Sequence, residues 1–472
     1  MQRTIDERLV RIVPSPRQLR IQNMAFYAFV HFTVNTFTDK EWGDGTESPA
    51  IFDPRKLDAE QWVESIKAAG MTGLILTCKH HDGFCLWPSR YTDHTVAHSP
   101  YKAGRGDVVR EVAQACRKGG IGFGIYLSPW DRHHPLYGTG KPYDDYFVAQ
   151  LTELLTGYGD IFTVWLDGAC GEGPNGKKQY YDWERYYRTV RTLQPDACIH
   201  ICGPDVRWCG NEAGQTRPSE WSVVPARTAD TEKVASLSQQ SDDPSFRQRT
   251  IRAWDLDLGS REALRDENDL IWYPAEVNTS IRPGWFWHPS EDEQVKPLAQ
   301  LIDIYEKSVG GNAMFLLNIP PTDEGLFHEN DVERLRQMGE YLRRSYGENL
   351  LAKAVLEASP AAQGHSIECI RSDDEAFYLP LAEDGTAEVT LRWAGAQCIR
   401  RVVLREQLRM SQRVESYALD AWQEGAWAEV ASGTVVGRQR IIPLEGICTD
   451  RLRIRITDAR IAPTLRFVGV YA

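Results

Sequence analysis

Asp167 stands directly after an apolar run, Phe162–Leu166, and directly before Gly168 and Ala169. A carboxylate in this place either caps a following helix or faces a substrate as a reactive group. The next convincing helix begins only near Asp182, so a cap at residue 167 has no adjacent helix to serve. The small residues after the carboxylate let another molecule approach it closely. The pattern therefore favours a nucleophilic carboxylate at the end of a strand.

Other polar and aromatic side chains gather where expected strands end. Where parallel strands alternate with helices in a barrel, the carboxyl ends of the strands meet at one face, and catalytic groups lie there. The side chains in question are His31, Glu41, Trp42, His80, His81, Tyr126, Trp130, Asp131, Glu212 and Glu276. Each of these side chains could instead serve only to stabilise the fold. Glu276, for example, could be a core-edge acid tied to Arg282, and spacing alone does not decide.

Two histidine pairs, His80-His81 and His133-His134, raise the question of a metal site. Adjacent residues on a strand point to opposite faces, so one ion rarely takes both as ligands. Neither the HxH nor the HExxH spacing of common zinc sites occurs in the chain. We therefore expect no metal, and nothing in the sequence calls for another cofactor.

The elements that would position these residues alternate regularly through the first 350 residues. DAEQWVESIKAAG, for example, reads as a helix with Asp58 as its N-cap and Gly70 as its stop. Eight short apolar runs read as strands: 24–32, 72–81, 121–129, 161–167, 198–204, 220–224, 271–277 and 314–321. Helices follow most of them, and no GxGxxG or Walker sequence follows the first. The series predicts a (β/α)8 TIM-like barrel, a member of the α/β class.

From about residue 350 the hydrophobic period changes to two. The alternation is cleanest where Leu452, Ile454 and Ile456 are interleaved with arginines. The segments expected to form strands are EVTLRWA, CIRRVVL, VESYALDAW and RLRIRIT. We expect a catalytic barrel over residues 1–348 and an all-β C-terminal sandwich over residues 349–472, with arginine on the solvent face of the sandwich.

Composition excludes some partners. The net charge is −12, which disfavours nucleic acid because a binding surface for phosphates must be densely positive. No apolar run reaches the roughly 18–20 residues of a membrane helix, and no secretory signal is visible at the N-terminus. Ten cysteines without a CxxC pair indicate mostly reduced, buried thiols, with room for a disulfide or two. We expect a cytoplasmic protein as given, or a periplasmic or secreted one if a signal was trimmed.

Six motifs together resemble one known family. They are VWLDGA, KHHDGFCLWPS, YLSPWDRH, RWCGNEAG, PAEVNTSIRPGWFWH and GNAMFLLNIPP, in order between about residues 20 and 345. They are similar to the α-L-fucosidases of glycoside hydrolase family 29, and most similar to its branch specific for α-1,3- and α-1,4-linked fucose. The C-terminal strands resemble, more loosely, the galactose-binding-like domains that accompany this family. One departure is Thr33-Val34-Asn35 after the first-strand histidine, where the family often has Gly.

The resemblance implies a retaining exo-α-L-fucosidase that acts on fucosylated oligosaccharides. It places the nucleophile on Asp167 and the acid/base on Glu212. The implied fucose contacts are His31, Glu41, Trp42, His80, His81 and Trp165, with Tyr126, Arg282 and Trp285 as further carry-overs.

Two alternatives stay open at this point. One is a catalytically inactive, lectin-like fucose-binding protein, and the other is a retaining glycosidase for another sugar such as galactose. The sequence does not indicate an oligomeric state, and it does not say what the sandwich binds.

Overall fold

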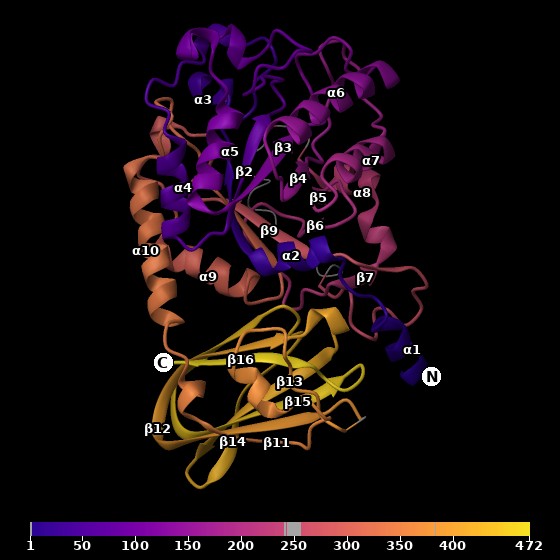
Figure 1. The fold of residues 1–472 in the computed structure, drawn as a ribbon, viewed down its shortest axis with the longest axis vertical. Helices are drawn as coiled ribbons and strands as arrows, with labels where there is room; N and C mark the ends of the chain where they lie inside the picture. The colour runs from indigo at the N-terminus through magenta and orange to yellow at the C-terminus, as the bar shows by residue number, and fades with distance from the viewer. Residues whose placement is uncertain (1, 240–241, 243–255, 383) are drawn as a thin grey trace.

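The computed structural model describes residues 2–239, 242, 256–382 and 384–472. Strands and helices alternate up to α10, and an antiparallel domain follows (Figure 1). In the view of Figure 1 the α/β part lies above the orange and yellow strands of the C-terminal part. Within the described residues, no helix is long and apolar enough to cross a membrane.

Eight parallel strands form the central sheet. In chain order they are β1 (Phe26–Val30), β2 (Gly73–Lys79), β3 (Gly122–Leu127), β4 (Thr163–Leu166), β5 (Cys198–Ile201), β6 (Arg207–Trp208), β9 (Ala275–Ser280) and β10 (Met314–Asn318). Their order in the sheet is β5-β4-β3-β2-β1-β10-β9-β6. An isolated parallel bridge between His200 and Val206 links the two edge strands, so the barrel is nearly closed. The predicted barrel is confirmed.

Helices surround this sheet, except α1 (Gln2–Leu9), which lies apart from the barrel beside the C-terminal domain (Figure 1). The surrounding helices are α2 (Pro16–Met24), α3 (Val34–Thr38), α4 (Ala59–Ala68), α5 (Val108–Gly119), α6 (Lys141–Gly157), α7 (Trp183–Leu193), α8 (Thr231–Leu237), α9 (Leu298–Ser308) and α10 (Glu329–Ser345). The predicted cap at Asp58 is confirmed, since its carboxylate accepts hydrogen bonds from the amides of Glu60 and Gln61. Trp62 and Ile66 on the inner face of α4 are fully buried, which is what holds so polar a helix to the sheet.

Two strand predictions are wrong in detail. The run EWSVV is not a barrel strand: its end forms β7 (Val223–Pro225), which pairs antiparallel with β8 (Leu270–Trp272) outside the barrel. The run IWYPAEV is split between β8 and β9. The barrel position is filled instead by the two-residue β6, which pairs with the start of β9. A strand this short carries no periodicity, and only closure of the barrel gives it partners.

The C-terminal domain is antiparallel throughout. Its strands are β11 (Val355–Ala358), β12 (Ala387–Glu406), β13 (Val414–Gln423), β14 (Ala426–Thr434), β15 (Arg440–Ala459) and β16 (Leu465–Tyr471). They pair in the order β11-β12-β15-β13-β14, and β16 also pairs with β12. The predicted strands EVTLRWA and CIRRVVL are parts of one 20-residue strand, β12. As predicted, Leu452, Ile454 and Ile456 are buried.

The cysteines are mostly free, and one pair is cross-linked. Cys398 on β12 forms a disulfide with Cys448 on β15, across two strands that pair at these residues. The eight remaining cysteines are free, and most of them are buried. Disulfides persist mainly in oxidising compartments, whereas buried thiols are compatible with either kind. The cellular compartment therefore stays a prediction.

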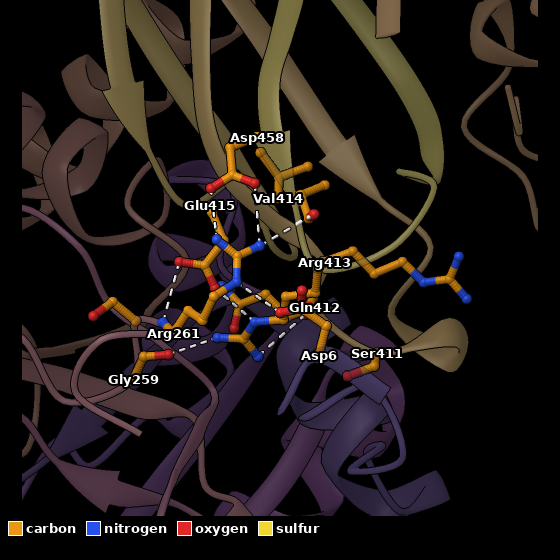
Figure 2. A network of polar contacts seen from close by, with 12 residues as sticks. Asp6, Gly259, Arg261, Ser411, Gln412, Arg413, Val414, Glu415 and Asp458 are labelled. Carbon is orange, nitrogen blue, oxygen red and sulfur yellow. Dashed lines mark hydrogen bonds and ion pairs between the residues drawn. The ribbon is translucent and has the colours of Figure 1, made fainter. Parts of the chain in front are cut away.

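An ion-pair network joins the C-terminal domain to the N-terminal part (Figure 2). The guanidinium of Arg261 contacts Asp6 of α1 at 2.7 Å and Asp458 of β15 at 2.7 Å. Arg460 lies beside it, fully buried, with its Nε 2.7 Å from Glu415 and a 2.6 Å hydrogen bond to the carbonyl of Gly259. Breaking a buried pair of this kind costs about 3–5 kcal/mol. The domains are therefore held by specific contacts as well as by apolar packing.

Candidate active site

A pocket lies at the carboxyl end of the barrel. Of the catalytic residues and fucose contacts that the resemblance implies, all except Arg282 line it: His31, Glu41, Trp42, His80, His81, Tyr126, Trp165, Asp167, Glu212 and Trp285. Three other candidates at the strand ends do not line it: Trp130 packs behind His81, Asp131 pairs with the buried Lys79, and Glu276 lies deeper in the barrel. The residues that line the pocket come from the ends of β1 to β4 and from the loops after β1, β6 and β9, which is why residues far apart in the sequence meet there.

Asp167 follows β4 directly, and two donors hold its carboxylate. The amide of Ala169 donates to Oδ1 at 2.9 Å, and the hydroxyl of Tyr126 donates to Oδ2 at 2.9 Å. Burial raises the pKa of Asp167, while these two hydrogen bonds favour its ionised form. Asp167 does not cap a helix, because α7 begins at Trp183 and has its own cap in Asp182. The carboxylate is thus oriented toward the pocket by fixed donors.

Glu212 is carried by the loop after β6. The indole Nε1 of Trp285 donates to its Oε2 at 2.9 Å. The loop is built on the fully buried Asn211, whose Oδ1 accepts from the amides of Ala213 at 3.0 Å and Gln215 at 3.1 Å. A buried asparagine that closes the turn fixes the backbone on both sides of Glu212. The second carboxylate therefore reaches the pocket from a structured loop.

The histidines of the pocket are neutral. Burial lowers the pKa of His31 to about 4, and it holds the pKa values of His80 and His81 well below the usual value. Nδ1 of His31 lies 2.8 Å from Oδ1 of Asn318, and Nδ1 of His81 lies 2.7 Å from the hydroxyl of Ser128.

The partners of these rings fix their tautomers. Asn318 Oδ1 can only accept, and the hydroxyl of Ser128 already donates to the carbonyl of Trp130 at 2.6 Å. Nδ1 of both His31 and His81 must then carry the hydrogen. Nε2 of each ring is left with a lone pair, which can accept a hydrogen bond from a hydroxyl group.

Glu41 ties the first loop of the barrel to the loop after β9. Its Oε2 accepts from the amide of Trp285 at 2.9 Å, and its Oε1 accepts from the amide of Phe286 at 3.1 Å. Nε2 of His288 lies 2.7 Å from the same Oε1. The hydrogen bond to Glu41 is the main cause that raises the pKa of His288 to about 9, with Asp39 adding to it. A protonated histidine therefore anchors this wall of the pocket.

His288 is expected to stabilise this wall only up to about pH 9. Its pKa in the folded state lies above the unfolded value of 6.5, so the stabilisation is complete below pH 6.5 and is lost as the pH rises through about 9. The melting temperature of His288→Gln should therefore fall furthest below that of the native protein near pH 6, and the difference should vanish above about pH 10. Thermal unfolding from pH 6 to pH 10 measures it. A difference that is constant across this range would contradict the assignment.

Arg282 is a corrected prediction. Its side chain is fully buried outside the pocket, with Nε 2.9 Å from Asp331 and Nη1 2.8 Å from Asp292. It braces the loop after β9 against α10 and reaches no substrate space. Glu276 is not tied to Arg282 either, because its carboxylate is hydrogen-bonded within the barrel to Tyr27 and other donors.

Further residues line the pocket that the sequence did not single out as substrate contacts: Phe29, Ala169, Ile201, Trp208, Ser238, Gln239 and Asn278. For two of these residues the sequence contained a feature that could have indicated the pocket. Trp208 lies in the segment that leads to Glu212, and Asn278 shares the inward face of its strand with Glu276, two residues away. Ser238 and Gln239 follow α8, and nothing in their sequence indicates the pocket. Within the described chain, no group of three or more His, Cys, Asp or Glu residues is placed to hold a metal ion.

Comparison with known proteins decides the family. The sequence profile of the α-L-fucosidase family matches residues 17–348, which is the whole barrel with its helices. The chain belongs to the α-L-fucosidase family. It is therefore a glycoside hydrolase of the α-L-fucosidase class, in agreement with two carboxylates in one pocket.

Individual members of the α-L-fucosidase family are similar over nearly the whole chain. α-L-Fucosidase 1 of Arabidopsis thaliana is 39% identical over 471 residues, which cover 97% of this chain and 87% of the plant protein. The structure of a glycoside hydrolase 29 family member from a rumen bacterium is 36% identical with a TM-score of 0.80, covering 98% of this chain and 77% of that one. A GH29 fucosidase of Ruminococcus gnavus, solved in complex with fucose, is 27% identical with a TM-score of 0.84, covering 98% and 95%.

Proposed function

We propose that this enzyme releases α-1,3- or α-1,4-linked L-fucose from the non-reducing ends of branched oligosaccharides, with retention of configuration. The placement of Asp167 and Glu212 in one pocket, each held by a fixed donor, carries the proposed hydrolysis. The proposed linkage rests on the resemblance of the six sequence motifs to the α-1,3/α-1,4-specific branch. The fucose complex of the Ruminococcus gnavus relative supports fucose as the sugar of this pocket.

In the proposed mechanism Asp167 attacks the anomeric carbon of fucose while Glu212 protonates the departing glycosidic oxygen. A covalent fucosyl-enzyme results, with its ester bond on Asp167. Glu212, now ionised, then takes a proton from water, and the water oxygen displaces Asp167 from the same face that the leaving group occupied. Two inversions give net retention. The amide of Ala169 and the hydroxyl of Tyr126 hold the nucleophile ionised and oriented between turnovers.

The other pocket residues supply partners for a neutral sugar. The Nε2 lone pairs of His31 and His81 accept from sugar hydroxyls, and both rings stay neutral because burial lowers their pKa values. Trp42, Trp165 and Trp285 offer flat apolar faces for C–H groups and for the methyl group at C5. No step of this mechanism needs a cofactor.

Time-resolved proton NMR tests the reaction and its stereochemistry together. The substrate is a trisaccharide in which fucose and galactose occupy neighbouring positions of one N-acetylglucosamine. Free fucose should appear first as the α-anomer and equilibrate to the β-anomer later. Initial release of the β-anomer would overturn retention. Release from a linear α-1,2-fucoside but not from the branched substrate would overturn the linkage assignment, and binding without release would favour the lectin-like alternative.

A further inference from the structure

Beneath the pocket, one buried carboxylate collects donors from three other strands. Glu276 of β9 is fully buried. Its Oε2 accepts from the hydroxyl of Tyr27 of β1 at 2.5 Å and faces Nδ1 of His200 of β5 at 2.8 Å. Its Oε1 accepts from the indole Nε1 of Trp165 of β4 at 2.8 Å. Both oxygens of the carboxylate are therefore engaged inside the barrel.

The strand period places Glu276 directly below the site. Asn278, two residues along β9 on the same inward face, lines the pocket, while Glu276 does not. Two residues of a strand span roughly 6.6 Å, so Glu276 lies about one layer of side chains deeper. It therefore contacts no substrate and can act only through the residues that it holds.

Trp165 is the residue through which Glu276 reaches the pocket. The indole lines the pocket and stacks on the ring of Tyr126, with centroids 5.4 Å apart and planes 29° apart. It also packs against Phe29 at 5.2 Å. Tyr126 in turn donates to Asp167. A continuous chain of contacts thus runs from Glu276 through two aromatic rings to the reacting carboxylate.

Placing a carboxylate in this layer of the barrel costs free energy, because the group is removed from water. Apolar side chains of similar volume would avoid the cost of removing a charge from water, and exchanging buried polar networks for them is often neutral or stabilising. Burial and the neighbouring Glu276 raise the pKa of Tyr27 well above its usual value, so its hydroxyl remains a donor. What an apolar residue could not do is accept the indole N–H and fix the plane of that ring.

We propose that Glu276 is a positioning residue, which anchors the Trp165 indole as a wall of the fucose pocket and, through the stacked Tyr126, orients Asp167. The proposal rests on the proposed function, in which the pocket binds fucose and Asp167 is the nucleophile. It predicts that fucose binding and kcat/KM depend on the oxygen that accepts the Trp165 N–H more than on the negative charge of Glu276. Glutamine keeps that oxygen, and its amide group can donate to the hydroxyl of Tyr27 and to the other tautomer of His200.

The test compares Glu276→Leu with Glu276→Gln. The readouts are the dissociation constant of free fucose by calorimetry and kcat/KM on the branched trisaccharide. Glu276→Leu should weaken fucose binding and lower kcat/KM, each by about ten-fold or more, because the indole loses its anchor. Glu276→Gln should recover both to within about three-fold of the native values. If Glu276→Leu binds fucose and turns over substrate as well as the native enzyme, the proposal is overturned. It is also overturned if Glu276→Gln loses as much binding and kcat/KM as Glu276→Leu.

A second pair of variants keeps the test decisive if Glu276→Leu does not fold. Trp165→Phe retains an aromatic ring but removes the N–H, so it should reproduce the loss. Glu276→Met, which is close to glutamate in length but has no acceptor oxygen, should lower kcat/KM by about ten-fold in the native enzyme and by less than about two-fold when it is added to Trp165→Phe, because the two residues act through one contact. If the losses in kcat/KM caused by the two single substitutions multiply in the double variant, the two residues act independently and the proposal is overturned.

Glu406→Gln is the matched control for a merely structural carboxylate. Glu406 of β12 is buried like Glu276 and accepts hydrogen bonds from the amides of Arg413, Val414 and Gly437 in the C-terminal domain. This variant should lower the melting temperature while fucose binding stays within about two-fold of native, since none of its partners lines the pocket. Failure of the proposed nucleophile is seen separately: it would appear as turnover in Asp167→Ala, and it would leave the fucose-binding comparison of the Glu276 variants unchanged.

Discussion

Asp167→Ala should lower kcat on α-L-fucosides by about 10⁴-fold or more and leave the binding of free fucose within about ten-fold of native. The carboxylate forms the bond to the anomeric carbon, so its removal eliminates the first displacement. Binding survives because the hydroxyl partners, His31 and His81, keep their own supports in Asn318 and Ser128. Steady-state kinetics and calorimetry with fucose measure the two effects.

Azide makes this test specific for a nucleophile. In Asp167→Ala the vacated space admits azide to the face that the carboxylate attacked, and a single displacement should yield the β-fucosyl azide. Asp160→Ala is the control, because Asp160 is exposed and lies just before the opposite end of the same strand. That variant should retain native kcat. Turnover by Asp167→Ala without azide, or formation of the α-azide, would assign the nucleophile elsewhere.

Most of the fold could be predicted because its signals are local. Each barrel strand with an apolar run of four or more residues was found, and so were α4 and its cap at Asp58. The failures lie where pairing depends on the closed ring. β6 has two residues, so nothing in its own sequence distinguishes it from a loop, and the more apolar EWSVV took its place in the prediction. Closure of a barrel depends on all its strands together, so the sequence of its shortest strand contains no signal that it belongs to the barrel.

The pocket was predicted in the same uneven way. Residues at the ends of strands were found because parallel strands bring those ends together, whatever their identity. The direction of a loop side chain was not available from sequence. Arg282 belongs to a motif that also carries Trp285, yet it turns into the protein toward Asp331, whereas Trp285 turns into the pocket. The sequence leaves open whether Glu276 pairs with Arg282, which is near it in the chain, and its actual partners come from β1, β4 and β5.

Glu212→Ala should produce a loss that depends on the leaving group. On the branched oligosaccharide, whose sugar alkoxide leaves only when protonated, kcat/KM should fall by about 10³- to 10⁴-fold. On an aryl fucoside with a nitrophenolate leaving group, kcat/KM should fall by about ten-fold or less, because that group departs without a proton. Glu172→Ala, which removes an exposed carboxylate from the loop after β4, should leave both substrates unaffected. Equal losses on the two substrates would show that Glu212 is not the acid.

The stereochemistry of azide rescue separates the two carboxylates. In Glu212→Ala the nucleophile is intact, so the aryl fucoside still forms the fucosyl-enzyme on Asp167. Azide needs no base to attack this ester, and it should both accelerate turnover and yield the α-fucosyl azide after two inversions. The same reagent should therefore give opposite anomers with Asp167→Ala and Glu212→Ala. Because loss of folding, loss of binding or a change of charge cannot invert a product, this pair of outcomes follows only if the two side chains have the roles proposed for them.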